Sequence, residues 1–231
     1  MMTRRALLIH GLSSNHGTWW RLTETLEANG WEVTAPDLRG HGAAAPADRY
    51  SFADYASDLP VGPFDLVVGH SLGGAIAVVA SSRVADSGAR VVLLDPVLEV
   101  AAEDWDEVRA DQIAELDLTE ESLRADKRHW DDRDIEHKLA AVRAADPVMV
   151  GRTFDDNPGW SVVPQISAIT VPTLILSGDP AVYSMLATST VEAVTAANPL
   201  VEYRVIAGAG HSPHRDKPDE TLAAILEFAD R

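Results

Sequence analysis

The sequence contains no cysteine. Disulfide bonds, thiolate metal sites and a cysteine nucleophile are therefore all excluded. It also lacks an apolar run long enough to span a membrane. The apolar residues 6–9 follow Arg4 and Arg5 as they would in an export signal, but the run stops at His10 and has no cleavage site. We therefore expect a cytoplasmic protein that is not inserted in a membrane.

Positive charge is scarce as well. The chain has 36 acidic residues against 19 lysines and arginines, which gives a formal net charge of −17. Such a charge argues against binding to nucleic acid or to anionic membrane surfaces. Residues 97–165 hold 18 of the acidic and 8 of the basic residues, so this segment alone contributes −10. If this acidic segment covers an apolar pocket, the pocket would favour a neutral or hydrophobic ligand over an anionic one.

What the chain does contain is a regular alternation of strand and helix patterns. Short apolar segments that predict buried strands lie at residues 6–9, 31–35, 64–68, 90–94, 171–176 and 201–206. Helical patterns lie at residues 17–29, 51–59, 74–80, 183–197 and 218–231. This alternation predicts an α/β fold, with a mainly parallel sheet of about six strands and helices on both faces.

The pentapeptide 69–73, Gly-His-Ser-Leu-Gly, lies between the third strand and an apolar helix. At such a turn glycines fit where larger residues would clash, and the serine is placed on a sharp, exposed elbow. The hydroxyl of Ser71 would then lie at the helix N-terminus, where free N–H groups and the helix dipole favour an oxyanion. We predict that Ser71 is a nucleophile. The alternative is a serine that caps the helix in a glycine-rich turn.

Four motifs together resemble the α/β-hydrolase superfamily. They are His10-Gly11, the segment 37–42 (Asp-Leu-Arg-Gly-His-Gly), the segment 69–74 and the segment 208–211 (Gly-Ala-Gly-His). They stand in the order and context of that family and span nearly the whole chain. The resemblance implies that residues 1–96 and 166–231 form the hydrolase core. Residues 97–165 then resemble the helical cap, or lid, that covers the site in family members and usually decides the substrate.

A serine hydroxyl needs a base that removes its proton as it attacks. His211 follows the sixth strand on a glycine-rich loop and resembles the last triad position of the family, so we predict that it is this base. The alternatives are that His211 is a surface-loop residue, or that His214 takes the role. His70 lies inside the elbow and is expected to point away from Ser71.

Two aspartates are candidates for the acid that orients the histidine. The usual family position falls on Ala181, and Asp179 comes two residues earlier. Asp95 ends the strand adjacent to the serine strand. It resembles the acid of a minority of the superfamily, which includes some lipases and the zearalenone-lactone hydrolases. We favour Asp95 and keep Asp179 as the alternative, although each could also be a turn residue before its proline.

Two main-chain N–H groups are predicted to hold the oxyanion. One belongs to Leu72, directly after the serine, and the other to Leu12, after the first strand. Removing one such donor typically lowers the rate by about 10²–10³-fold. Side-chain substitution tests these donors poorly, because they belong to the main chain.

Four tryptophans are expected at the substrate. Trp19 and Trp20 follow the first strand where an apolar pocket wall would fit, and Trp105 and Trp130 lie in the predicted cap. The alternative is that these residues are core anchors of their helices. No glycine pattern fits a phosphate-binding loop or a dinucleotide fingerprint, and no histidines stand at metal-ligand spacing, so no cofactor or metal is expected.

The predicted function is hydrolysis of a carboxylic ester or lactone of a small molecule, through an acyl-enzyme on Ser71. The same fold also supports C–C bond hydrolysis and hydroxynitrile cleavage, and the first forty residues resemble plant hydroxynitrile lyases and their methylesterase relatives. Those lyases carry threonine where this chain has Gly11, which favours hydrolysis. A non-catalytic ligand-binding receptor is the other alternative, against which the intact Ser71 and His211 argue.

Overall fold

The computed structural model describes residues 3–231, except for the side chains of residues 82–88. At its centre lies a six-stranded sheet with the strand order β2-β1-β3-β4-β5-β6, in which every neighbouring pair is parallel. The predicted six-stranded parallel sheet is therefore confirmed. The strands are β1 (Arg4–Ile9), β2 (Trp31–Thr34), β3 (Phe64–His70), β4 (Ala85–Leu94), β5 (Thr173–Ser177) and β6 (Val201–Val205).

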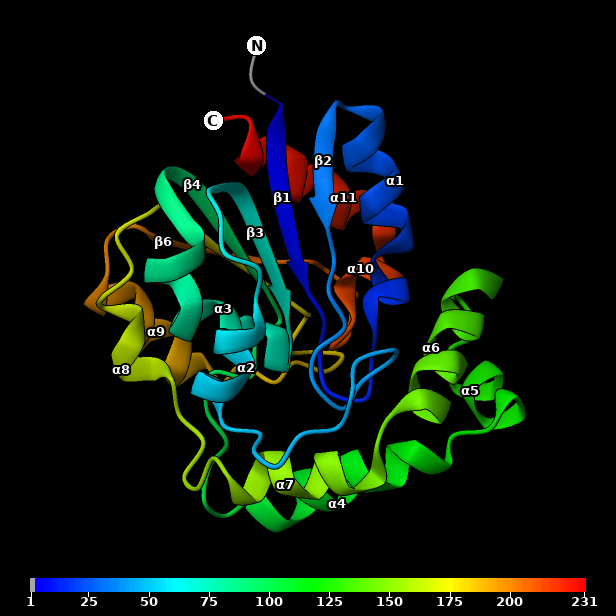
Figure 1. The fold of residues 1–231 in the computed structure, drawn as a ribbon. Helices are drawn as coiled ribbons and strands as arrows, with labels where there is room; N and C mark the ends of the chain where they lie inside the picture. The colour runs from blue at the N-terminus through cyan, green and yellow to red at the C-terminus, as the bar shows by residue number, and fades with distance from the viewer. Residues whose placement is uncertain (1–2) are drawn as a thin grey trace.

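Helices cover both faces of the sheet (Figure 1). One face carries α1 and α11, and the other carries α2, α3, α8 and α9. Their bounds are α1 (Trp20–Ala28), preceded by the short helix η1 (His16–Trp19), α2 (Phe52–Asp58), α3 (Leu72–Val84), α8 (Val163–Ile166), α9 (Thr188–Ala197) and α11 (Pro218–Ala229).

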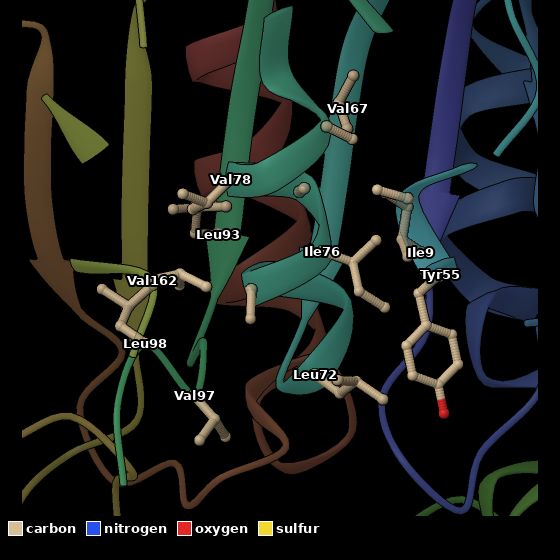
Figure 2. Close-up of a cluster of buried hydrophobic side chains, with 14 of the residues drawn as sticks. Ile9, Tyr55, Val67, Leu72, Ile76, Val78, Leu93, Val97, Leu98 and Val162 are labelled. Atoms are coloured by element: carbon tan, nitrogen blue, oxygen red, sulfur yellow. The ribbon is translucent and has the colours of Figure 1, made fainter. Parts of the chain in front are cut away.

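The alternation of side chains along the strands divides the core into two clusters. In β1, Leu7 and Ile9 join the cluster under α2 and α3, whereas Ala6 and Leu8 join the cluster under α1 and α11. Figure 2 shows the first cluster, in which Ile76 of α3 packs among strand and helix side chains. Because α3 has the sheet on one side and α2 on another, its apolar run is buried nearly all round.

The segment of residues 97–165, here called the helical insertion, joins β4 to the second half of the sheet. Its helices lie beyond the carboxyl ends of the strands, at the opposite end of the molecule from the chain termini (Figure 1). An isolated antiparallel bridge between Glu99 and Ser161 closes its base. The insertion contains α4 (Trp105–Ala114), η2 (Glu115–Asp117), α5 (Glu120–Asp126), α6 (Asp132–Ala144) and α7 (Pro147–Asp155).

One predicted helix begins later than expected. The pattern predicted a start at Tyr183, but α9 begins at Thr188. The intervening chain is held in an extended turn because Ser184 Oγ and Met185 N donate hydrogen bonds to the carboxylate of Asp95. The short helix α10 (Pro213–Asp216) was not predicted. In the described part of the chain, no helix combines the length and the apolar character needed to cross a membrane.

Candidate active site

Ser71 lies on the turn between β3 and α3. Its main chain has a φ of 55°, a left-handed value that is unusual for a residue with a side chain. Gly69 and Gly73 allow this turn, since a Cβ on Gly69 would overlap the main chain of Gly73, and one on Gly73 would overlap the carbonyl oxygen of Ile9. The serine is thereby held directly before the first turn of α3, whose leading N–H groups have no partner within the helix.

Three side chains from distant parts of the sequence form one hydrogen-bonded chain. His211 Nε2 lies 3.0 Å from Ser71 Oγ, and His211 Nδ1 lies 2.6 Å from Asp95 Oδ2. A carboxylate can only accept, so Nδ1 carries the hydrogen and a neutral imidazole presents Nε2 to the hydroxyl as an acceptor. This tautomer is the one that can take a proton from serine.

The carboxylate of Asp95 is fully buried and fully hydrogen-bonded. Its Oδ1 accepts from Gly178 N at 2.9 Å and from Ser184 Oγ at 2.6 Å, and its Oδ2 accepts from Met185 N at 3.1 Å. Burial alone would raise the pKa of Asp95. The hydrogen bond and charge of His211, together with the other donors, outweigh burial and hold this pKa below its usual value. The aspartate therefore stays ionised beside the histidine.

The alternative acid, Asp179, is engaged elsewhere. Its Oδ2 accepts from Gly208 N and its Oδ1 from Ala181 N, both at 2.9 Å, and these two bonds lower the pKa of its carboxyl. Its carboxylate thus ties two loops together. Within residues 3–231, the structure brings Asp95 to His211 and gives Asp179 no hydrogen bond to that ring.

His70 packs against His211, and His214 packs against the other side of this pair through His70. The ring centroid of His70 lies 5.0 Å from that of His211 and 4.8 Å from that of His214. His214 Nε2 lies 3.0 Å from Thr18 Oγ1, so His214 bonds to Thr18 and not to Ser71. Burial lowers the pKa of His70 to about 3 and that of His214 well below its usual value, so both rings are neutral.

A cavity of about 610 Å³ adjoins Ser71. Its wall comes from the sheet end and from the helical insertion. Leu12 and Leu72, whose N–H groups we predicted to hold the oxyanion, both line it. Trp130 also lines it, as expected, and so does Trp160, which was not among the four tryptophans predicted at the substrate.

The other three predicted tryptophans are not among the residues that line this cavity. Trp19 is only 1% exposed and belongs to the core under α1 and α11. Trp20 directs its indole N–H to Asp134 at 2.9 Å. Trp105 packs edge-on against Phe154. Helical spacing places an aromatic on a face of its helix, but it does not say what that face covers.

Asp216 is a site residue that sequence analysis did not single out. Its carboxylate accepts from Gly210 N at 2.7 Å, Trp130 Nε1 at 2.6 Å and His129 Nε2 at 2.9 Å. It therefore ties the loop before His211 to the helical insertion. A single acid in a four-residue helix has no periodicity that could have revealed it. No group of three or more His, Asp or Glu side chains in the described residues is arranged to hold a metal ion.

Comparison with known proteins identifies the family. The model of the alpha/beta hydrolase family matches residues 6–225, and the chain therefore belongs to this family. It is 27% identical to the pimeloyl-[acyl-carrier protein] methyl ester esterase of Edwardsiella ictaluri, over 98% of this chain and 93% of that protein. It is 39% identical over 101 residues to the lipase LipV of Mycobacterium tuberculosis, a match that covers 41% of this chain and 38% of the lipase. The crystal structure of E-2-(acetamidomethylene)succinate hydrolase has the same fold, with a TM-score of 0.81 and 23% identity over 99% of this chain and 92% of that chain.

Proposed function

We propose that the protein is a serine hydrolase that cleaves a carboxylic ester or lactone of a small molecule. The observation that carries this proposal is the hydrogen-bonded chain from Ser71 Oγ through His211 to Asp95, with distances of 3.0 and 2.6 Å. It ends in a cavity large enough for a small organic molecule. The esterase and lipase among the relatives agree with ester chemistry.

In the proposed reaction, Ser71 Oγ attacks the acyl carbon while His211 Nε2 takes the hydroxyl proton. The carbonyl oxygen becomes an oxyanion, which the N–H groups of Leu12 and Leu72 would stabilise. As the ester C–O bond breaks, His211 gives its proton to the departing alkoxide oxygen, and the acyl group remains on Ser71. Water then attacks the acyl carbon and gives its proton to His211. The acid product leaves, and the proton returns to Ser71. Asp95 keeps its charge and stabilises the imidazolium.

We further propose that residues 97–165 act as the cap of this site and that residues 1–96 and 166–231 form the catalytic core. Supporting this division, the cavity wall combines core residues such as Leu12 with insertion residues such as Trp130 and Trp160. The bonds of Asp216 hold the insertion against the loop of the base. A cytoplasmic location stays a prediction.

The structure gives a reason to prefer hydrolysis to hydroxynitrile cleavage. A Cβ on Gly11 would lie only 3.0 Å from the Cβ of Ser71 and 3.2 Å from His70 Nδ1, so a threonine there would press on the nucleophile. A non-catalytic receptor would have no need of a buried, ionised Asp95 on the far side of His211 from the serine.

Turnover of a para-nitrophenyl ester tests the proposal. The wild type should hydrolyse it, and Ser71→Ala should lose this activity while it keeps a cooperative thermal transition. A Ser71→Ala variant that retains wild-type turnover would remove the serine from the mechanism.

A further inference from the structure

Two cationic side chains are buried in the wall of the cavity. Arg215 lies in α10 and is 5% exposed, and Lys138 lies in α6 and is 6% exposed. Both line the same cavity as Ser71 and His211. A buried cation is costly unless its charge and its N–H groups find partners, so the partners of each residue decide what it does there.

The charge of Lys138 is matched within the protein. Its Nζ lies 2.9 Å from a carboxylate oxygen of Glu115 and donates to the carbonyl oxygen of Ser13 at 3.3 Å. Burial lowers the pKa of Lys138, and Glu115 counteracts that effect. This ion pair needs no further anion.

Arg215 is less completely hydrogen-bonded than Lys138. Among the described residues its one hydrogen bond runs from Nη2 to Thr18 Oγ1 at 2.7 Å, and its buried Nε has none. The closest ion-pair contact is from Nε to Asp134 Oδ1 at 4.0 Å, which is too long for a hydrogen bond. That carboxylate already accepts from Trp20 and Arg21.

The position of the Arg215 guanidinium is nevertheless fixed. The ring of Trp130 lies against it, with 4.8 Å from the guanidinium carbon to the ring centroid. Arg215 also follows His211 by four residues, so α10 sets its place relative to the base. A fixed guanidinium with unused donors, in a cavity beside a nucleophile, is suited to bind a carboxylate.

None of the acidic residues described in the cavity lining accepts a hydrogen bond from Arg215. Asp216 accepts three hydrogen bonds from other groups, and Glu115 is paired with Lys138. Asp111 and Asp126 also line the cavity but lie on its exposed side, since both residues are exposed to solvent. Among the described residues that line the cavity, Arg215 is thus a buried cation with no carboxylate within hydrogen-bond distance, although the insertion as a whole is acidic.

We propose that Arg215, in the wall of the cavity that adjoins Ser71, forms a subsite for a carboxylate that the substrate carries in addition to its scissile acyl group. This inference rests on the proposed function of Ser71. It replaces the neutral or hydrophobic substrate expected from the acidic composition, because overall charge does not describe the wall of a buried cavity.

Paired substrates test the subsite kinetically. We would compare para-nitrophenyl hemiglutarate, which ends in a carboxylate, with the neutral para-nitrophenyl hexanoate. The wild type should favour the acid-bearing ester in kcat/KM by about tenfold or more, the typical worth of a hydrogen bond to a charged group. In Arg215→Gln this preference ratio should fall by about 10–100-fold. Arg143→Gln removes an exposed arginine outside the cavity lining and is the matched control, in which the ratio should stay at the wild-type value.

A binding measurement on Ser71→Ala tests the subsite with Arg215 intact and without turnover of the ligand. Monomethyl esters of succinate, glutarate and adipate should include at least one that binds, by calorimetry, at least about tenfold more tightly than its dimethyl ester. Equal binding of the acid and neutral forms throughout the series would overturn the subsite, as would an unchanged kinetic preference in folded Arg215→Gln. A wild type that hydrolyses no ester would instead overturn the proposed function, while the calorimetry would still decide the subsite.

Discussion

His70 Nε2 lies 2.8 Å from the main-chain carbonyl oxygen of His211 and donates a hydrogen bond to it. The elbow that carries Ser71 is thereby bonded to the loop that carries the histidine. His70 can only be a donor here, because a carbonyl oxygen accepts. Burial, followed by the nearby charge of His211, lowers the pKa of His70 to about 3, so the ring remains neutral at neutral and mildly acidic pH. We infer that His70 positions the base.

Replacing His70 by alanine should therefore lower kcat more than it raises KM. A misplacement of about 1 Å can lower a rate by about 10²-fold, so a loss of about 10–100-fold in kcat is expected. His70→Gln, which can still donate to the carbonyl, should recover part of kcat. Steady-state kinetics on a para-nitrophenyl ester measures both constants, and His16→Ala, at an exposed histidine away from this loop, is the control. If kcat stays at the wild-type value in folded His70→Ala, the positioning role is lost.

The two candidate acids can be separated by matched substitutions. Asp95→Asn should reduce kcat by about 10³–10⁴-fold, because an amide in place of the carboxylate favours the wrong tautomer of His211. Asp179→Asn should change kcat by no more than a few-fold, since that residue bonds Gly208 and Ala181. The same ester assay on both variants is sufficient. The reverse order of the two effects would make Asp179 the acid.

Two glycine-to-alanine substitutions should change stability in opposite directions. Gly73→Ala puts a Cβ onto the carbonyl oxygen of Ile9, a main-chain atom that cannot rotate away, and should destabilise the fold by roughly 1–3 kcal/mol. Gly151 lies inside α7 with no atom closer than 3.5 Å to an added Cβ. Gly151→Ala should therefore stabilise the protein by roughly 0.5–1 kcal/mol. Denaturant unfolding measures both, and a stabilising Gly73→Ala would refute the tight elbow.

Mild acid should destabilise the fold, because four buried histidines must gain protons when the chain unfolds. Burial lowers the pKa of His10 to about 4 and the pKa values of His41 and His70 to about 3, and it lowers that of His214 well below its usual value. In the unfolded chain each returns to about 6.5. Between about pH 6.5 and 4 the unfolded state thus binds more protons, so the free energy of unfolding falls as pH falls.

The slope should approach about 1.4 kcal/mol per pH unit for each buried histidine. Denaturant unfolding at several pH values between 7.5 and 4.5 measures it. His41→Gln removes one of the four histidines and should lower the slope by about 1.4 kcal/mol per pH unit. A free energy of unfolding that is constant across this range would show that these histidines are not held neutral.

The parts of the fold that sequence predicted best are those with a strong local cause. Six apolar segments and their helices gave the parallel sheet, and glycines 69 and 73 marked the elbow because no other residue fits there. Ser71 and His211 lie at ends of strands, and such ends meet at one edge of a parallel sheet. Their proximity was therefore predictable without coordinates.

The site features that the sequence did not predict depend on the conformation of the loops. Ser184 and Met185 donate hydrogen bonds to Asp95 from a segment that was expected to be helical, so this part of the Asp95 environment could not be predicted. Trp19 and Trp20 lie next to each other in sequence, yet one is core and the other pairs with Asp134. The buried Arg215 gave no signal, because one arginine in a short helix looks like a surface residue.

Labelling with a fluorophosphonate tests the central claim most directly, because this reagent reacts with a serine only where a neighbouring base activates it. Intact mass and peptide mapping of the wild type should show one adduct, on Ser71, and folded Ser71→Ala should show none. Asp95→Asn should be labelled much more slowly than Asp179→Asn. A folded wild type that acquires no adduct, or one whose adduct maps to another residue, would contradict an activated Ser71.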